Sequence, residues 1–245
     1  MIELLCLEAV TKYFDGVCAV GEISMVVPAG GFVAVVGPNG AGKTTLLDLV
    51  GGACRPDAGS VWFAGRDITG WPAHQVCAVG IGRTFELPQP FAALSVEDNV
   101  IMGALLRDYA VAEARHRAGE VLERLGLSAL SRRPAASLSL AGRKRLDLAR
   151  AVATKPRLLL LDEPLAGLSP DERDDMMAIL RALNQRRRLA VLMTEHRLVA
   201  VADLADHVVI LDHGQAIACG TPRELANLAA DGVTCVPGAS ARELP

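Results

Sequence analysis

The stretch GFVAVVGPNGAGKTTLLDLVGG, residues 31–52, decides the fold. Its first part is a continuous apolar run that ends in glycine, which is the pattern of a β-strand buried on both faces. The glycine-rich turn that follows leads into a segment with helical periodicity. A buried strand joined to a helix in this way predicts a parallel sheet with crossover helices, and therefore an α/β fold.

Residues 37–44, GPNGAGKT, match the pattern G-x-x-x-x-G-K-[ST] of a phosphate-binding loop. Its glycines allow the backbone to turn N–H groups toward an anion, and the positive end of the next helix adds to the attraction. Lys43 is expected to reach the β- and γ-phosphates, and the Thr44 hydroxyl to bind Mg²⁺. The pattern predicts a site for a nucleoside triphosphate and does not identify the reaction. The glycines are Gly37, Gly40 and Gly42.

A second buried strand, LLLLDE at residues 158–163, ends in two acids. Carboxylates at the carboxyl end of a strand beside a phosphate loop lie where such folds carry out Mg²⁺ chemistry. Asp162 is expected to bind Mg²⁺ or orient its water, and Glu163 to act as general base on the water that attacks the γ-phosphate. His196 ends the neighbouring predicted strand, so its imidazole is expected to hydrogen-bond the γ-phosphate.

The rest of the chain shows how the sheet domain is organised. Residues from about 88 to 152 have helical periodicity with little strand signal, which predicts a helical lobe inserted into the sheet domain. Strands are predicted at 4–14 and 22–27, and a hairpin at 207–220. The prediction is one domain over residues 1–230, followed by a tail of weak periodicity at 231–245.

Composition limits the classes of function. A net charge of −3 over 245 residues does not suggest a nucleic-acid-binding protein, and the basic clusters at 143–145 and 186–188 are interpreted as solvated helix faces. The six cysteines form no C-x-x-C pair, which argues against a zinc site and suits a reducing cytosol. No apolar run approaches the roughly 20 residues that span a bilayer, so a role at a membrane would require a partner.

The ordered set of motifs resembles the ATP-binding subunit of an ABC transporter, from about Leu4 to Leu225. The resemblance implies a P-loop NTPase fold, with a RecA-like parallel sheet core, an antiparallel β subdomain and a helical subdomain. It implies that Glu163 is catalytic, that His196 is the switch histidine and that LAGLS, residues 165–169, is the D-loop, where Ser169 stands in place of the usual Asp. The residues implied to bind ATP are Phe14 (with Tyr13 the alternative) at adenine, and Gly37, Pro38, Asn39, Gly40, Ala41, Gly42, Lys43, Thr44, Thr45 and Ser139.

The signature loop (residues 138–142, LSLAG) falls where the family has LSGGQ. Leu140 and Ala141 replace the two glycines; shifting the alignment to use Gly142 would put Leu140 in the place of the serine. Ser139 is predicted to be the N-cap of the following helix. The resemblance implies that Ser139 and the first helical N–H groups also meet the γ-phosphate in a partner subunit. The Ala141 methyl group is expected to loosen this contact, so Ala141→Gly is expected to strengthen ATP-dependent dimerisation.

Position 86 is a second departure from the family, which has glutamine directly after RTF. The resemblance implies that Glu86 is a ligand of Mg²⁺, together with Thr44 and Asp162, and Gln89 is the second candidate for this role. A carboxylate attracts the metal and repels the γ-phosphate, so the net effect on turnover is left open.

Residues 80–100 and 158–170 most resemble the branched-chain amino acid importer group, which includes urea and amide relatives. This resemblance implies three partners: transmembrane permease subunits, a second ATP-binding subunit, identical or paralogous, and indirectly a solute-binding protein. It also implies a peripheral location at the cytoplasmic face of the membrane. Leu87, Phe91 and Leu94 are expected to line a groove for the permease or to pack internally. A soluble ABC ATPase that is not coupled to transport, and a P-loop kinase, are the alternatives.

Overall fold

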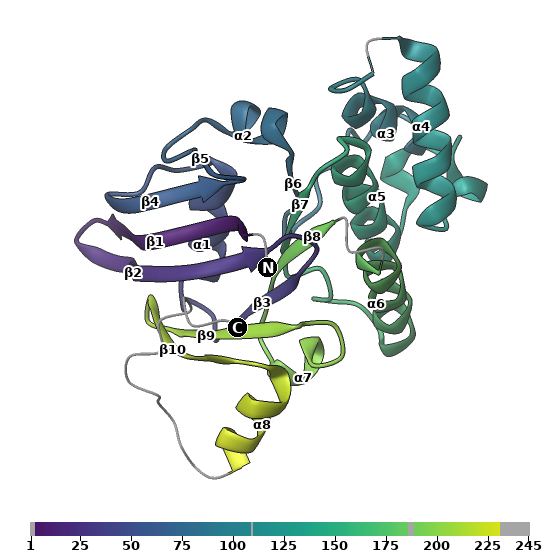
Figure 1. Ribbon diagram of the computed structural model, residues 1–245. Helices are drawn as coiled ribbons and strands as arrows, with labels where there is room; N and C mark the ends of the chain where they lie inside the picture. Colours follow the sequence, from purple (N-terminus) through teal and green to yellow (C-terminus); the bar gives the residue numbers. More distant parts are fainter. Residues whose placement is uncertain (1–2, 109, 186–188, 231–245) are drawn as a thin grey trace.

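The computed structural model describes residues 3–108, 110–185 and 189–230 (Figure 1). Its central sheet has the strand order β10-β9-β3-β8-β7-β6, and every neighbouring pair except β9 with β10 runs parallel. The predicted α/β class is confirmed, and the apolar run before the phosphate loop lies in the interior of the sheet as β3. The strands are β3 (Phe32–Val36), β6 (Ile81–Arg83), β7 (Leu158–Asp162), β8 (Ala190–Glu195), β9 (His207–Asp212) and β10 (Gln215–Gly220).

A second, antiparallel sheet has the order β2-β1-β4-β5. β1 and β2 form a long hairpin whose turn is the Asp15–Gly16 pair that the sequence predicts. Both tryptophans lie on this side of the molecule, Trp62 in β4 and Trp71 after β5. The strands are β1 (Glu3–Phe14), β2 (Val17–Pro28), β4 (Ala58–Phe63) and β5 (Arg66–Asp67).

The central sheet is covered on both faces, and alternate residues of its strands enter two different cores. Leu159 and Leu161 on β7 face the helices of one side, whereas Leu158 and Leu160 face α1 (Lys43–Gly51) and the antiparallel sheet. Side chains of a strand point alternately to opposite faces. A run of four leucines is therefore what a parallel strand buried on both faces requires.

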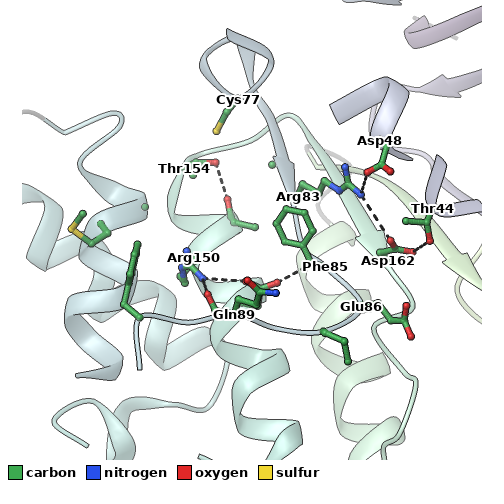
Figure 2. A pocket seen from close by; sticks show the side chains of 17 residues that line it. Thr44, Asp48, Cys77, Arg83, Phe85, Glu86, Gln89, Arg150, Thr154 and Asp162 are labelled. Carbon is green, nitrogen blue, oxygen red and sulfur yellow. Dashed lines mark hydrogen bonds and ion pairs between the residues drawn. The ribbon is translucent and has the colours of Figure 1, made fainter. Parts of the chain in front are cut away.

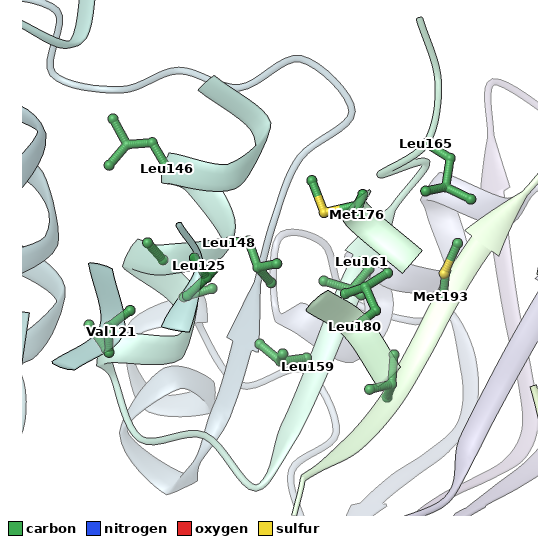
Figure 3. Close-up of a cluster of buried hydrophobic side chains, with 14 of the residues drawn as sticks. Val121, Leu125, Leu146, Leu148, Leu159, Leu161, Leu165, Met176, Leu180 and Met193 are labelled. Atoms are coloured by element: carbon green, nitrogen blue, oxygen red, sulfur yellow. The ribbon is translucent and has the colours of Figure 1, made fainter. Parts of the chain in front are cut away.

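Helices on one face form the helical lobe and its neighbour α6 (Figure 1). Figure 3 shows Leu148 of α5 and Met176 and Leu180 of α6 around the leucines of β7, with Leu146 on the side of α5 away from the sheet. Serine side chains cap three of these helices by accepting a backbone N–H. The helices, with their caps, are α3 (Val96–Ala104, Ser95), α5 (Leu140–Ala153, Ser139) and α6 (Pro170–Asn184, Ser169), and α4 (Val111–Arg124) completes the lobe. Two single turns of 3₁₀ helix, Ser128–Leu130 and Ala135–Ser137, join α4 to α5.

Several short elements are absent from the sequence-based prediction. These are α2 (Ala73–Val79), β5, β6 and α8 (Pro222–Ala230), whereas the predicted short helix after β8 is present as α7 (Leu198–Val201). In α2 only Val76 is buried, so the helix has no apolar stripe from which to predict it. The tail at 231–245 and the basic cluster at 186–188 lie outside the described residues. Within the described ranges, no helix combines the length and apolar character needed to cross a bilayer.

Candidate active site

The phosphate loop (residues 37–44) lies between the carboxyl end of β3 and the first turn of α1. Gly42 precedes the helix with φ at +98°, and a Cβ atom on this residue would overlap the carbonyl oxygen of Ala19 on β2. The backbone angle and the neighbouring strand therefore both require glycine here. The Ala41 carbonyl accepts the N–H of Gly214 at 3.1 Å, which joins the loop to the hairpin of β9 and β10.

The start of α1 has the geometry of an anion site. The first four N–H groups of an α-helix have no partner within the helix, and they carry partial positive charge. Here Gly42 is the N-cap, and no side chain in the described part of the chain hydrogen-bonds to it. Before it, Pro38, Asn39 and Gly40 are exposed and Ala41 is buried, so the loop presents its outer backbone to solvent. Thr45, one residue further than Thr44, is half-buried.

Lys43 is buried inside the loop that it belongs to. Its Nζ atom donates to the carbonyl oxygens of Gly37 at 2.8 Å and Pro38 at 3.0 Å. The same atom lies 3.4 Å from Glu163 Oε1 and 3.4 Å from His196 Nδ1. If Lys43 binds a triphosphate, as the sequence predicts, its Nζ atom must leave these two carbonyl oxygens and donate to phosphate oxygens instead.

Asp162 and Thr44 lie together at the carboxyl end of β7, as the sequence predicts. Asp162 Oδ1 accepts the hydroxyl of Thr194 at 2.8 Å. The same atom accepts the hydroxyl of Thr44 at 3.3 Å, and Arg83 Nη2 lies 3.9 Å from Oδ2 (Figure 2). A buried carboxylate beside a hydroxyl is a set of hard oxygen donors. This donor set fits Mg²⁺, which proteins bind through one or two carboxylates together with substrate phosphates and water.

Glu163 and His196 are brought together because β7 and β8 are neighbours in the sheet. His196 Nε2 lies 2.6 Å from Glu163 Oε2, and the Glu163 carboxylate is almost fully buried. The backbone of Glu163 has φ at +43°, which costs on the order of 1–3 kcal/mol in a residue with a Cβ atom. Backbone strain of this kind is concentrated at functional sites, where surrounding contacts hold it.

A cavity of about 770 Å³ opens beside Thr44 and Asp162, between the central sheet and the helical lobe (Figure 2). Glu86 lines it together with Thr44 and Asp162, which leaves Glu86 available as a third oxygen ligand. Gln89 also lines the cavity, but it lies beside Arg150 on the side of the helical lobe (Figure 2), where its backbone carbonyl oxygen accepts Arg150 Nη1 at 3.1 Å. This arrangement supports Glu86 over Gln89.

The apolar part of the cavity wall is open to solvent. Leu87 is 70% exposed and Phe91 is 49% exposed, with the guanidinium of Arg150 at 5.1 Å from the Phe91 ring centre. Leu94 is also exposed. Of the two expectations for these residues, the groove is the one that agrees with their exposure.

Ser139 caps α5 as predicted, and its Oγ atom accepts the N–H of Gly142 at 3.2 Å. Ala141, however, is only 7% exposed and belongs to the core beneath the helical lobe. Its methyl group points into its own subunit, so the expectation that it keeps a neighbour away has lost its steric basis. Leu140, which stands in place of the family's first signature glycine, is half-buried. Its Cδ2 atom lies close to Gly167 of the D-loop, where a Cβ atom added to the glycine would be 3.0 Å away.

The two aromatic candidates for adenine, Phe14 and Tyr13, are both about half exposed at the tip of the β1–β2 hairpin. The Lys12 ammonium lies 5.3 Å from the Phe14 ring centre. Consecutive residues of a strand point to opposite faces, so the two rings lie on opposite faces of the hairpin. The choice of Phe14 stays a prediction.

Sequence reasoning missed Lys144, which it placed on a solvated face with Arg143 and Arg145. The prediction was wrong for this residue, because Lys144 is 6% exposed and donates from Nζ to the Glu163 carbonyl oxygen at 2.7 Å. Burial lowers the pKa of Lys144, against the opposing effect of nearby carboxylates. Burial likewise raises the pKa of Glu195, whose Oε1 accepts the N–H of Leu165 at 3.0 Å.

The family model described as ABC transporter matches residues 20–166. The chain is 32% identical over 237 residues to the high-affinity branched-chain amino acid transport ATP-binding protein BraF of Pseudomonas aeruginosa, covering 91% of this chain and 93% of the relative. It is 34% identical over 227 residues to the lipopolysaccharide export system ATP-binding protein LptB of Acidithiobacillus ferridurans, with 93% and 94% covered. The solved ADP conformation of MJ1267, an ATP-binding cassette of an ABC transporter, has a TM-score of 0.85 at 31% identity, covering 94% of this chain and 96% of that one.

Proposed function

Because the chain belongs to the ABC transporter family, as an ATP-binding and ATP-hydrolysing subunit, we propose that it powers a permease importing branched-chain amino acids or related small polar solutes. BraF, and the relative LivG of Archaeoglobus fulgidus at 33% identity over 92% of each chain, are named for branched-chain amino acid transport. LptB is equally similar overall but is named for lipopolysaccharide export. The choice of amino acids therefore depends on the resemblance at residues 80–100 and 158–170. The relatives named above are transport proteins and give no support to a soluble ATPase.

The observation that carries the proposal is the meeting of Lys43, Glu163 and His196 within 3.4 Å at the carboxyl edge of the sheet. The N–H groups that open α1 bind the phosphates, and Lys43 turns from the carbonyls of the loop to the β- and γ-phosphates. Thr44, Asp162 and Glu86 are the residues that would hold Mg²⁺. The ion supplies positive charge that offsets the charge developing on the phosphate oxygens.

Glu163 accepts a proton from the attacking water, whose oxygen then bonds to the γ-phosphorus as the bond to the leaving ADP breaks. His196 holds the carboxylate through its Nε2 atom in the present arrangement. Its partly exposed imidazole is proposed to hydrogen-bond the γ-phosphate once ATP is bound. The products are ADP and inorganic phosphate. No acceptor other than water is required, which separates this reaction from that of a kinase.

Two subunits, identical or paralogous, are proposed to pair head to tail around ATP, with Phe14 at adenine and Ser139 supplied by the partner. The helix that Ser139 caps places N–H groups at the γ-phosphate of that second site. ATP then favours the closed dimer, and hydrolysis removes the γ-phosphate contacts that hold it.

The exposed side chains of Leu87 and Phe91 in the cavity wall, together with the exposed Leu94, are proposed to receive the permease at the cytoplasmic face of the membrane. A solute-binding protein would take part indirectly by delivering solute to that permease.

We also propose that residues 1–230 form one ATPase domain, with the helical lobe at about 88–152.

Glu163→Gln tests the reaction. Phosphate release without an acceptor is expected to fall by about 10²–10⁴-fold, the usual contribution of a general base. ATP binding is expected to persist and to trap a dimer, seen by size-exclusion chromatography. The matched control is Glu120→Gln on the exposed face of α4, expected to release phosphate at the wild-type rate.

Retained phosphate release in Glu163→Gln would contradict the assignment of the base. A variant that binds ATP but stays monomeric would contradict the head-to-tail dimer. Co-purification with a permease, followed by solute binding to its cognate binding protein, tests the proposed transport; amino acids that fail to bind there would contradict the proposed solute class.

A further inference from the structure

Lys144 is a buried lysine that no step of the proposed reaction uses. On α5 it shares a buried stripe with Ala141, Leu148 and Ala151, at successive spacings of three, four and three residues. An ammonium group removed from water is costly unless it is hydrogen-bonded. The acceptor that Lys144 reaches therefore indicates what the residue is for.

That acceptor is the backbone carbonyl oxygen of Glu163, at 2.7 Å from Nζ. The N–H of Glu163 donates to Thr194 Oγ1 on β8, at 3.2 Å. Side chains from two different elements thus hold the backbone on both sides of the Glu163 Cα atom. They hold it with φ at +43°, a left-handed conformation that a residue with a Cβ atom keeps when its surroundings enforce it.

A third contact fixes the end of the same turn. Glu195, buried at the end of β8, accepts the N–H of Leu165 through Oε1 at 3.0 Å. Lys144 and Glu195 therefore hold the first carbonyl and the last N–H of residues 163–165. Their opposite charges lie on either side of this turn, which offsets part of the cost of burying each.

We propose that Lys144 is a positioning residue for the Glu163 carboxylate, acting through the Glu163 carbonyl group. The direction in which a side chain leaves the backbone depends on the backbone angles, so a change at this peptide would move the carboxylate away from the attacking water. A misplacement of about 1 Å costs on the order of 10²-fold in rate. Among the described residues Lys144 donates no hydrogen bond to the proposed metal ligands, although the charges of Glu86 and Asp162 act on its pKa. This inference rests on the proposed role of Glu163 as the base.

Lys144→Met in the full-length chain removes the donor and keeps the length of the side chain. We expect kcat for ATP hydrolysis to fall by roughly 10–100-fold while the Kd for ATP changes by less than about threefold. Lys144→Arg retains donors and is expected to restore most of kcat. Arg145→Met is the matched control, because its exposed ion pair with Asp175 lies away from the turn, and wild-type kcat is expected.

Replacing Lys144 by Met takes away the opposite charge beside the buried Glu195, so the Met variant is expected to be less stable than the wild-type protein. Circular dichroism checks that it still folds, and Lys144→Ala replaces it if it does not. Wild-type kcat in a folded Met or Ala variant, with Glu163→Gln inactive in the same assay, would overturn this inference alone. Wild-type kcat in Glu163→Gln would overturn the proposed base and this inference with it. An equal loss of kcat in Lys144→Met and Lys144→Arg would also overturn this inference, since the loss would then not depend on the hydrogen bond to the Glu163 carbonyl oxygen.

Discussion

Two loops of this chain bring backbone N–H groups to the start of a helix, and they differ in their need for glycine. In the phosphate loop, Gly42 has a positive φ and lies against the Ala19 carbonyl oxygen, so no side chain fits. In the signature loop, Leu140 and Ala141 occupy ordinary helical positions, and Ala141 packs into the core.

The difference separates two origins of a glycine requirement. In the phosphate loop the requirement arises within the subunit, from its own backbone and the adjacent strand. Nothing in the described part of the subunit imposes one at Leu140 or Ala141. A need for glycine in the signature loop would therefore have to come from a closely approaching partner and its ATP, and the following substitutions test this.

Gly42→Ala is expected to have the largest effect. The strained φ and the overlap with Ala19 are expected to lower the free energy of unfolding by more than about 2 kcal/mol. Displacement of the loop is expected to weaken ATP binding by roughly 100-fold, or about 2.7 kcal/mol. Urea denaturation and titration calorimetry measure these two quantities.

Gly65→Ala is the matched control for this substitution. Gly65 also has a positive φ, at +77°, but open space surrounds the position of its Cβ. It is expected to cost about 1 kcal/mol of stability and to leave ATP affinity unchanged. Equal ATP affinity in Gly42→Ala and Gly65→Ala would show that the overlap at Ala19 is not decisive.

Leu140→Gly is expected to have an intermediate effect, on association. In the Glu163→Gln background, removal of the half-buried leucine is expected to tighten the ATP-dependent dimer by about fivefold, or about 1 kcal/mol, because it gives the partner's nucleotide closer access to the start of α5. Analytical ultracentrifugation with ATP measures the dimer constant. A weaker dimer would show that Leu140 contributes to the interface instead of obstructing it.

Ala141→Gly is expected to have the smallest effect, and it serves as the control for Leu140→Gly. The buried methyl group and the helix propensity of alanine are lost, so the free energy of unfolding is expected to fall by about 1 kcal/mol. The dimer constant in the Glu163→Gln background is expected to stay unchanged. A tighter dimer would restore the view that this alanine loosens the ATP sandwich.

The sequence was sufficient to predict most of the central strands, the phosphate loop and the pairing of the two neighbouring strands that lead to Glu163 and His196. These follow from local patterns: apolar runs of strand length, a spacing of glycines with one lysine, and the rule that parallel strands end at the same edge. The short β6, with a glycine between Ile81 and Arg83, gives no such pattern, because its neighbours in the sheet hold it in place.

Helical periodicity could have predicted that Lys144 is buried. Residues 141, 144, 148 and 151 form one stripe, and three of the four are apolar. Grouping Lys144 with its two arginine neighbours concealed this position. The sequence could not have predicted that Lys144 donates to the Glu163 carbonyl oxygen, because 19 residues separate the two and only the packing of α5 on β7 brings them together.

The placement of both tryptophans in the antiparallel sheet has a consequence for optical measurements. Trp62 and Trp71 contact Ser60 and Arg66, so the intrinsic fluorescence of this chain reports on that sheet and its core. The helical lobe has no tryptophan, and its unfolding is followed by far-ultraviolet circular dichroism. Because β7 contributes leucines to both cores, the two signals are expected to change at the same denaturant concentration. Separate transitions would mean that the central sheet does not make the two cores into a single cooperative unit.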